Sequence, residues 1–322
     1  MKFKTVITAA LACATLCFGA SNTAAAAEPW TGTIKLVVPY PPGGNTDNLA
    51  RLFAERMTAE LGQVMIIENR GGAGGTIGAQ GVARSNPDGS TLLLAPTAIM
   101  AITPYLRSVP YDPIKDFVSV AKLASTMGIV AVPKDFPANN MQEFIAYAKA
   151  HAGTMTYGSA GLGTATHLQS AALLNHLGLT ALHVPYKGSG PAMNDLMAGR
   201  IDMMFDSILL TQIKNGQLKG LALKAGTRHP ELPNVPTLKE QGIDIELPSW
   251  YGLYAPAGTP KAVVDRYTAA AKKIMADPGL QAQLLALSQQ VTYLGPADFE
   301  KATAADAKLY RTLIQQANIK MD

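Results

Sequence analysis

Residues 38 to 57, VPYPPGGNTDNLARLFAERM, pass from a short apolar strand through a turn rich in proline and glycine into a helix. No side chain in this stretch is a typical nucleophile or metal ligand, so whatever the turn binds must be held largely by its backbone. In the helix, apolar side chains recur at the spacing of one face, namely Leu49, Leu52, Phe53, Met57 and Leu61. The stretch therefore predicts a strand followed by a helix that packs one face on a sheet.

The same order of strand, turn and helix recurs along the chain, as is typical of an α/β fold with mostly parallel sheets. Two long extended stretches, 117–133 and 247–260, are expected to cross between two series of such units. We therefore predict two lobes, each a doubly wound, mostly parallel sheet with flanking helices. Their cleft is a usual place for a ligand. The predicted lobes are 28–130 with 253–322, and 131–252.

The N-terminus has the three parts of a secretory signal: Lys2 and Lys4, an apolar run, and small residues that end at Ala27. Cleavage after Ala27 would remove Cys13 and Cys17, the only cysteines, so no disulfide or cysteine metal site is expected afterwards. Charges are scattered and the formal net charge is only +4, which argues against nucleic-acid binding. No later apolar run reaches the roughly 18 residues of a membrane span. We predict an exported, soluble and unanchored protein.

The loop PPGGNTD is a candidate anion site. Its glycines let a ligand approach the backbone, and the free amides of the next helical turn carry about half a positive charge. The alternative is an ordinary turn between strand and helix. Because open α/β sheets bind ligands at the carboxyl ends of their strands, we favour binding. The candidate contacts are Tyr40, which would wall the pocket, and Pro42, Gly43, Gly44 and Thr46.

The loop GSAGLGTATH, residues 158–167, has the same construction in the second series. Its hydroxyls can donate to an anion and accept from amides, which suits a carboxylate held by neutral donors. The alternative is that Ser159 and Thr164 only cap the helix, and for His167 a structural role is favoured over ligand contact. The candidate contacts are Ser159, Gly161, Thr164, Ala165, Thr166 and His167.

Enzyme signatures are missing from the sequence. RGGAGGTIG, residues 70–78, fails the dinucleotide-binding pattern because Ile77 stands where the third glycine belongs, so a close-packed turn near the cleft is expected. Neither G-x-S-x-G nor H-E-x-x-H occurs, and the histidines lack metal spacing. A carboxylate pair could still be assembled from Asp47, Asp202 or Asp206. Asp206 is a candidate for the cleft, where it is expected to fix loops rather than meet an anion, because like charges repel.

Five motifs in order, VPYPPGGNTD, IIENRGGAGGTIGA, YGSAGLGTATHL, VPYKGSGPAMNDLMAGRID and YGLYAPAGTP, resemble the Bug family of extracytoplasmic solute receptors. These are the binding proteins of tripartite tricarboxylate transporters. The likeness covers essentially the whole chain after the signal. It implies a periplasmic, type II-like two-lobed binding-protein fold that closes on a small organic acid, with a carboxylate held by 40–46 and 158–167, partly through water.

The resemblance also implies no reaction, no cofactor and no metal. The expected partners are a mono- or dicarboxylate, aromatic or amino acids included, and membrane permease subunits, with the receptor itself a monomer. Gln169, Ser170 and Ser207 depart from residues common in the family, and no arginine cluster marks a second carboxylate, so the far end of the ligand is left open. The alternatives are a secreted α/β hydrolase or isomerase acting on a small acid or ester, and a receptor that serves a sensor.

Overall fold

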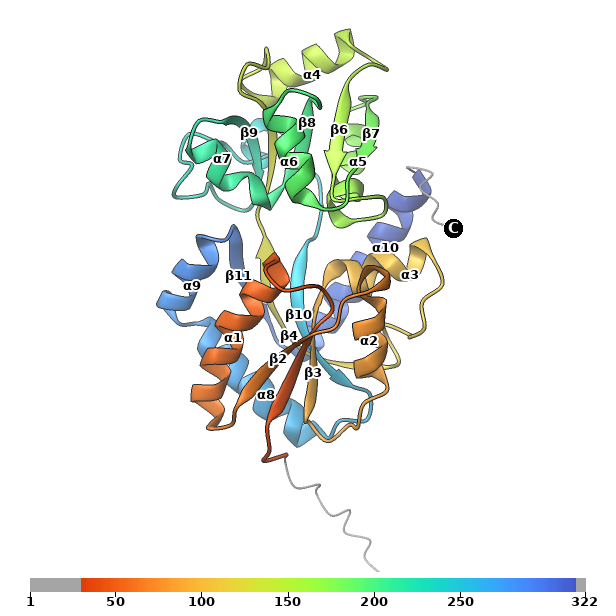
Figure 1. Ribbon diagram of the computed structural model, residues 1–322, viewed down its shortest axis with the longest axis vertical. Helices are drawn as coiled ribbons and strands as arrows, with labels where there is room; N and C mark the ends of the chain where they lie inside the picture. The colour runs from red at the N-terminus through yellow and green to blue at the C-terminus, as the bar shows by residue number, and fades with distance from the viewer. Residues whose placement is uncertain (1–29, 317–322) are drawn as a thin grey trace, which may run out of the picture.

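The computed structural model describes residues 30–316, so the predicted signal and its cysteines lie outside the described part. Two sheets form two lobes, one above the other in Figure 1. The first sheet has strand order β11-β4-β10-β3-β1-β2 and the second β7-β6-β8-β5-β9. Both are mixed, because the strands that connect the lobes run antiparallel to their neighbours. This confirms the predicted two-lobed α/β fold, but the sheets are mixed rather than mostly parallel as predicted.

The elements of the first lobe come from both ends of the chain. They are β1 (Ile34–Val38), α1 (Asn45–Leu61), β2 (Met65–Asn69), α2 (Thr76–Ala83), β3 (Thr91–Pro96), α3 (Thr103–Leu106), β4 (Phe117–Thr126), β10 (Trp250–Pro256), α8 (Lys261–Met275), α9 (Pro278–Leu285), β11 (Gln289–Leu294) and α10 (Pro296–Gln316).

The second lobe is built from the middle of the chain. Its elements are β5 (Gly128–Pro133), α4 (Met141–Ala150), β6 (Thr156–Ser159), α5 (Ala165–His176), β7 (Leu182–Pro185), α6 (Ser189–Met197), β8 (Met203–Asp206), α7 (Leu210–Lys214) and β9 (Leu218–Lys224).

Each crossing occurs about three residues earlier than the sequence suggested. β5 already begins at Gly128, so 128–130 pair in the second sheet although they were expected in the first lobe. Likewise β10 begins at Trp250, so 250–252 pair in the first sheet although they were expected in the second lobe. Only Met127 separates β4 from β5, so one nearly continuous extended segment serves both sheets.

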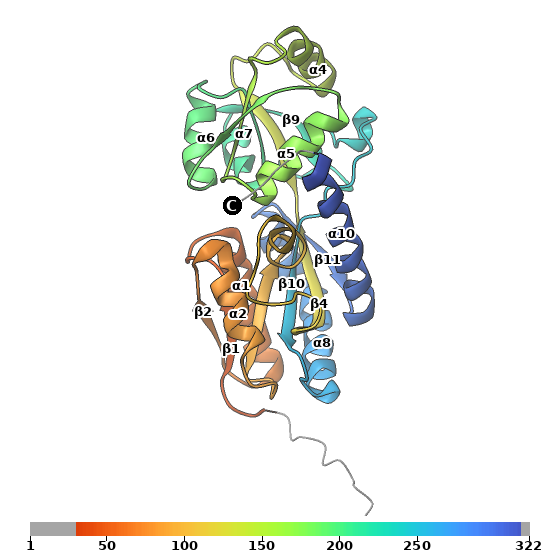
Figure 2. The same cartoon turned by 90° about the vertical axis from the view of Figure 1, so that its right-hand side faces the viewer.

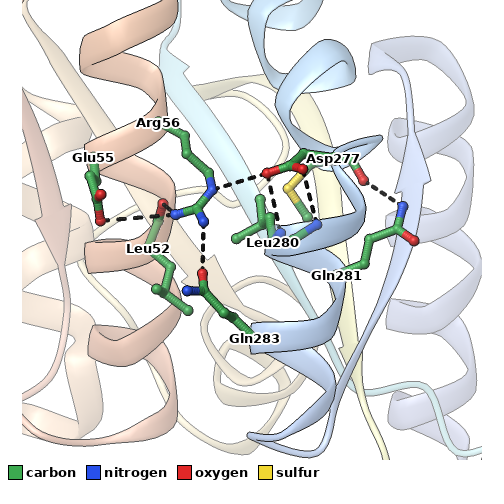
Figure 3. Close-up of polar contacts among 9 residues, drawn as sticks. Leu52, Glu55, Arg56, Asp277, Leu280, Gln281 and Gln283 are labelled. Carbon is green, nitrogen blue, oxygen red and sulfur yellow. Dashed lines mark hydrogen bonds and ion pairs between the residues drawn. The ribbon is translucent and has the colours of Figure 1, made fainter.

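Helix α1 follows the predicted pattern. Leu49, Phe53 and Met57 are fully buried against the first sheet. The helix ends at Gly62, whose left-handed φ of 65° allows its amide to bond the carbonyl of Thr58. On the outer side, Arg56 reaches α9, where it donates to Gln283 at 2.7 Å and to Asp277 at 3.5 Å (Figure 3). α1 is therefore packed on the first sheet on one side and bonded to α9 on the other. These contacts fix the position of its first turn.

The last helix has few long apolar residues, which predicts a position on the surface, but the structure differs. α10 buries Phe299, Tyr310 and Ile314, and it runs alongside both lobes in Figure 2. Near its C-terminal end it packs on Leu168 of α5, and the Tyr310 hydroxyl donates to the Pro248 carbonyl. α10 therefore ties the second lobe to the first, in addition to the two crossings.

Candidate ligand-binding site

Helix α1 begins at the first candidate loop without a side-chain cap. Gly44 is its N-cap residue and has extended backbone. The amides of Asn45, Thr46 and Asp47 cannot bond within the helix. Across residues 30–316 they donate to no other group. Three donors and the positive end of the helix dipole are therefore available to an anion.

Asp47, in the same turn, fastens the loop. Its carboxylate accepts from the Gly43 amide at 2.9 Å, from Arg51 Nε at 2.9 Å and from Asn69 Nδ2 at 2.9 Å. Gly43 has a φ of 89°, a backbone conformation that favours glycine. Burial raises the pKa of Asp47, but hydrogen bonds from Arg51, Gly43 and Asn69 outweigh it and hold the pKa below its ordinary value. The Asp47 carboxylate is therefore neutralised by groups of the protein, and its repulsion of an anion bound at the helix start is reduced.

Helix α5 begins at the second candidate loop with a cap. The Thr164 hydroxyl donates to the Gly161 carbonyl at 2.7 Å and accepts from the His167 amide at 3.4 Å. The Thr166 hydroxyl accepts from the Ala160 amide at 3.0 Å. Several loop amides are therefore satisfied internally. Those of Ala165 and Thr166 have no acceptor among the described residues, so this end offers fewer donors than α1.

Both helix starts open into one cavity of about 360 Å³ between the lobes. Its wall is a mixture of hydroxyl, amide and aromatic groups with few charges. Phenol groups stay neutral there: desolvation raises the pKa of Tyr40 to about 12, with Arg107 acting in the opposite direction. The polar and aromatic residues of the lining include Tyr40, Asn45, Thr46, Thr97, Arg107, Thr126, Thr164, Ala165, Thr166, Gln169, Ser189, Asp206, Ser207, Ser249, Trp250 and Tyr251.

Half of the candidate contacts line this cavity: Tyr40, Thr46, Thr164, Ala165, Thr166 and Asp206. The other half, Pro42, Gly43, Gly44, Ser159, Gly161 and His167, lie outside its lining. Pro42, Gly43 and Gly44 are exposed, and the Gly43 amide is already bonded to Asp47. Gly161 donates its amide to the Ser159 hydroxyl. These residues contribute to the conformation of the two loops and not to the wall of the cavity.

Buried His167 and half-buried His183 stack against each other beside the second loop. Their rings lie 3.7 Å apart, and His167 Nδ1 accepts from the Gly163 amide at 3.1 Å. Burial lowers the pKa of both imidazoles to about 4, and for His167 the neighbouring His183 adds to the shift. His167 is thus a neutral support for the loop, in line with the structural role favoured from the sequence.

Several lining residues had no signal in the local sequence. Thr126 and Ser249 lie at the crossings, and Trp250 and Tyr251 open β10. Thr97 directly follows β3, and its hydroxyl accepts from the Trp250 amide at 2.7 Å. The aromatic run in 247–260 was recognised only as a crossing. Their position in the chain could have predicted them, because the segments that join two lobes necessarily pass the floor of the cleft between them.

Asp206 lies in the lining but its oxygens are occupied. The carboxylate accepts from the Ser189 hydroxyl and from the Ile208 amide, the latter at 3.1 Å. Burial raises its pKa, and these hydrogen bonds offset part of that shift. It therefore fixes the loops after β7 and β8, the role that the sequence suggested for it.

Ser159 and His183 form a contact of the kind that activates a catalytic serine. The Ser159 hydroxyl and His183 Nε2 share a hydrogen bond of 2.7 Å. A nucleophile must reach its substrate, yet Ser159 is 0% exposed and does not line the cavity. The pair is placed to hold β6 and β7 together. Residues 30–316 also contain no group of three metal-binding side chains and no helix long and apolar enough to cross a membrane.

The family described as "Tripartite tricarboxylate transporter family receptor" matches residues 49–319. The chain belongs to this receptor family. A UPF0065 protein from Cupriavidus necator is 35% identical over 287 residues, 89% of this chain and 88% of that protein. The periplasmic binding protein BugD aligns with a TM-score of 0.76 at 35% identity, covering 90% of this chain and 99% of its own.

A further solved structure extends the likeness to a protein with a bound ligand. The R. palustris protein Rpa4515, solved with adipate, aligns with a TM-score of 0.81 at 30% identity, covering 90% of this chain and 98% of that one. Such relatives are solute-binding receptors rather than enzymes. The predicted Bug-type identity and receptor function are thereby confirmed at the level of the family.

Proposed function

We propose that this receptor captures one carboxylate of a small organic acid between the starts of α1 and α5. The observation that carries the proposal is that both helix starts, one from each lobe, open into the same cavity with unpaired amides. Backbone amides at a helix start bind anions without any charged side chain. A relative solved with adipate supports a carboxylate as the ligand class.

Binding from both lobes couples capture to closure. A carboxylate held by α1 alone or α5 alone gains fewer hydrogen bonds than one held by both, so it favours the closed arrangement by that difference. The closed receptor then delivers its ligand to the membrane permease subunits of a tripartite transporter. This role places the chain in the periplasm as a monomer, and it requires no turnover of the ligand.

Thermal unfolding with a panel of mono-, di- and tricarboxylates tests the proposal. At a ligand concentration of about 100 Kd, binding to the folded state alone adds about 2.7 kcal/mol of stability, which raises the melting temperature measurably. The expected result is a clear rise for a subset of acids, each recovered chemically unchanged. A folded protein that responds to no acid in the panel, or that converts one, contradicts the proposal.

A further inference from the structure

Arg107 is the only cationic side chain in the cavity lining given by residues 30–316. It follows the short helix α3 and is partly exposed. No carboxylate in the described part of the chain pairs with it: the ion pairs there involve other arginines and lysines. Because Arg107 lines the cavity and forms no ion pair within the described residues, its charge is available to a ligand.

The turn 73–75 holds this guanidinium. The sequence predicted only a close-packed turn here and no function for it. Arg107 Nη2 donates to the Ala73 carbonyl. Ala73, Gly74 and Gly75 all have positive φ, at 45°, 65° and 96°, so the chain curls tightly there. A Cβ on Gly74 would lie 2.7 Å from Nη2. A Cβ at position 74 would therefore displace the guanidinium from its present place, and Gly74 itself also lines the cavity.

The donors of Arg107 are only partly used. A guanidinium has five N–H donors, and the single bond to Ala73 is the one that it makes within residues 30–316. The remaining edge can bind a carboxylate with two parallel hydrogen bonds. Asp206, the other charged group of the lining, is not a competitor, because it is engaged by Ser189 and Ile208 in the second lobe.

We propose that Arg107 binds a second carboxylate of the ligand, so that the receptor selects dicarboxylates over monocarboxylates of the same chain length. This inference rests on the proposed function, in which the helix starts hold the first carboxylate. It assigns the far end of the ligand, which the sequence left open, to Arg107 on the turn 73–75.

Calorimetric titration with matched acids tests the selection. Succinate, glutarate and adipate are compared with butyrate, pentanoate and hexanoate. We expect at least one diacid to bind the wild-type chain at least about tenfold more tightly than its monoacid. In Arg107→Gln the affinity for that diacid should fall about 10- to 100-fold, while the monoacid affinity changes by less than about threefold. Arg107→Lys should retain part of the preference, because it keeps the charge but loses the planar fork.

Two further variants separate recognition from folding. Arg84→Gln removes an exposed arginine of the same lobe and should leave both affinities unchanged. Gly74→Ala should weaken the diacid selectively by displacing the guanidinium. Equal affinity for diacid and monoacid in the wild type, or a loss of both in Arg107→Gln, overturns the inference and leaves the proposed function standing. Binding of none of the six acids by the folded protein overturns the inference, and a lack of binding across the whole panel of the thermal test contradicts the proposed function as well.

Discussion

At the scale of single residues, the support of the second loop depends on two neutral histidines. His167 stacks on His183, which bonds Ser159 at the end of β6, and the Tyr157 ring lies 5.0 Å from that of His183 and 6.2 Å from that of His167. No charged group takes part in these contacts. Protonating one imidazole would put a positive charge beside the other ring and remove the acceptor used by the Gly163 amide.

The stack predicts a dependence of stability on pH. Both folded-state pKa values, about 4, lie below the ordinary 6.5. The unfolded chain therefore binds more protons between these values, and the stack's contribution is complete above about pH 6.5 and lost as the pH falls through about 4. In His167→Asn, the free energy of unfolding should fall less steeply over this window, by up to about 1.4 kcal/mol per pH unit.

Urea unfolding at several pH values measures these slopes. His176→Gln, at an exposed histidine on the same helix, is the matched control and should keep the wild-type slope. A His167→Asn slope equal to that of the wild type would show that the stack does not titrate as the contacts indicate.

The residues of the site differ in how far they could be predicted. Thr164 and Thr166 follow from local pattern, because a loop of glycines and hydroxyl residues before a helix places its hydroxyls at the helix start. Ser159 belongs to the same motif yet bonds His183, because it is the last residue of β6 and the lining of the cavity begins only at Ala160 in the following loop. Arg107 was missed because its partner, Ala73, is 34 residues away.

At the scale of elements, α10 joins the lobes through a polar cluster at the hinge. Asp306 on α10 accepts from Trp250 Nε1 at 2.6 Å, and it attracts Lys122 of β4 and Lys224 of β9. Burial, with Lys122 adding to it, lowers the pKa of Lys224 to about 7, while Asp306 acts to raise it. One carboxylate therefore compensates two lysines that come from different sheets.

Removing that carboxylate should be costly. Asp306→Ala leaves the Trp250 N–H unpaired and both lysines uncompensated, so we expect a loss of about 2–3 kcal/mol in the free energy of unfolding, measured with urea. Asp265→Ala breaks an exposed pair with Lys261 and is expected to cost less than about 0.5 kcal/mol. Equal costs for the two variants would contradict the role given to Asp306.

The elements themselves were largely predictable, with one instructive exception. β1 with α1 and β6 with α5 follow from short apolar runs, glycine turns and helical periodicity. α10 was expected on the surface because its buried side chains, Phe299, Tyr310 and Ile314, are widely spaced, with only small Ala307 between them. They share a helical face, but its covering comes from both lobes, which local periodicity cannot reveal.

At the scale of the whole molecule, the two lobes touch at the wall of the cavity. Asn45 Nδ2, at the first position of α1, donates to the Ser207 hydroxyl after β8 at 3.1 Å. Within the first lobe, Gln289 Nε2 donates to the Asn45 carbonyl at 3.0 Å and supports this position. The same turn of α1 thus offers its amides to the cavity and its side chain to the other lobe. Ligand capture and lobe closure share one helix start.

The most direct test is a titration of ¹⁵N-labelled protein, followed by NMR, with the acid that raises the melting temperature most. The account predicts that the amides of Asn45, Thr46, Ala165 and Thr166 show the largest saturable shift changes, all with one dissociation constant. If these amides stay unmoved while a saturable response appears elsewhere, the two helix starts do not hold the ligand, and the central claim is contradicted.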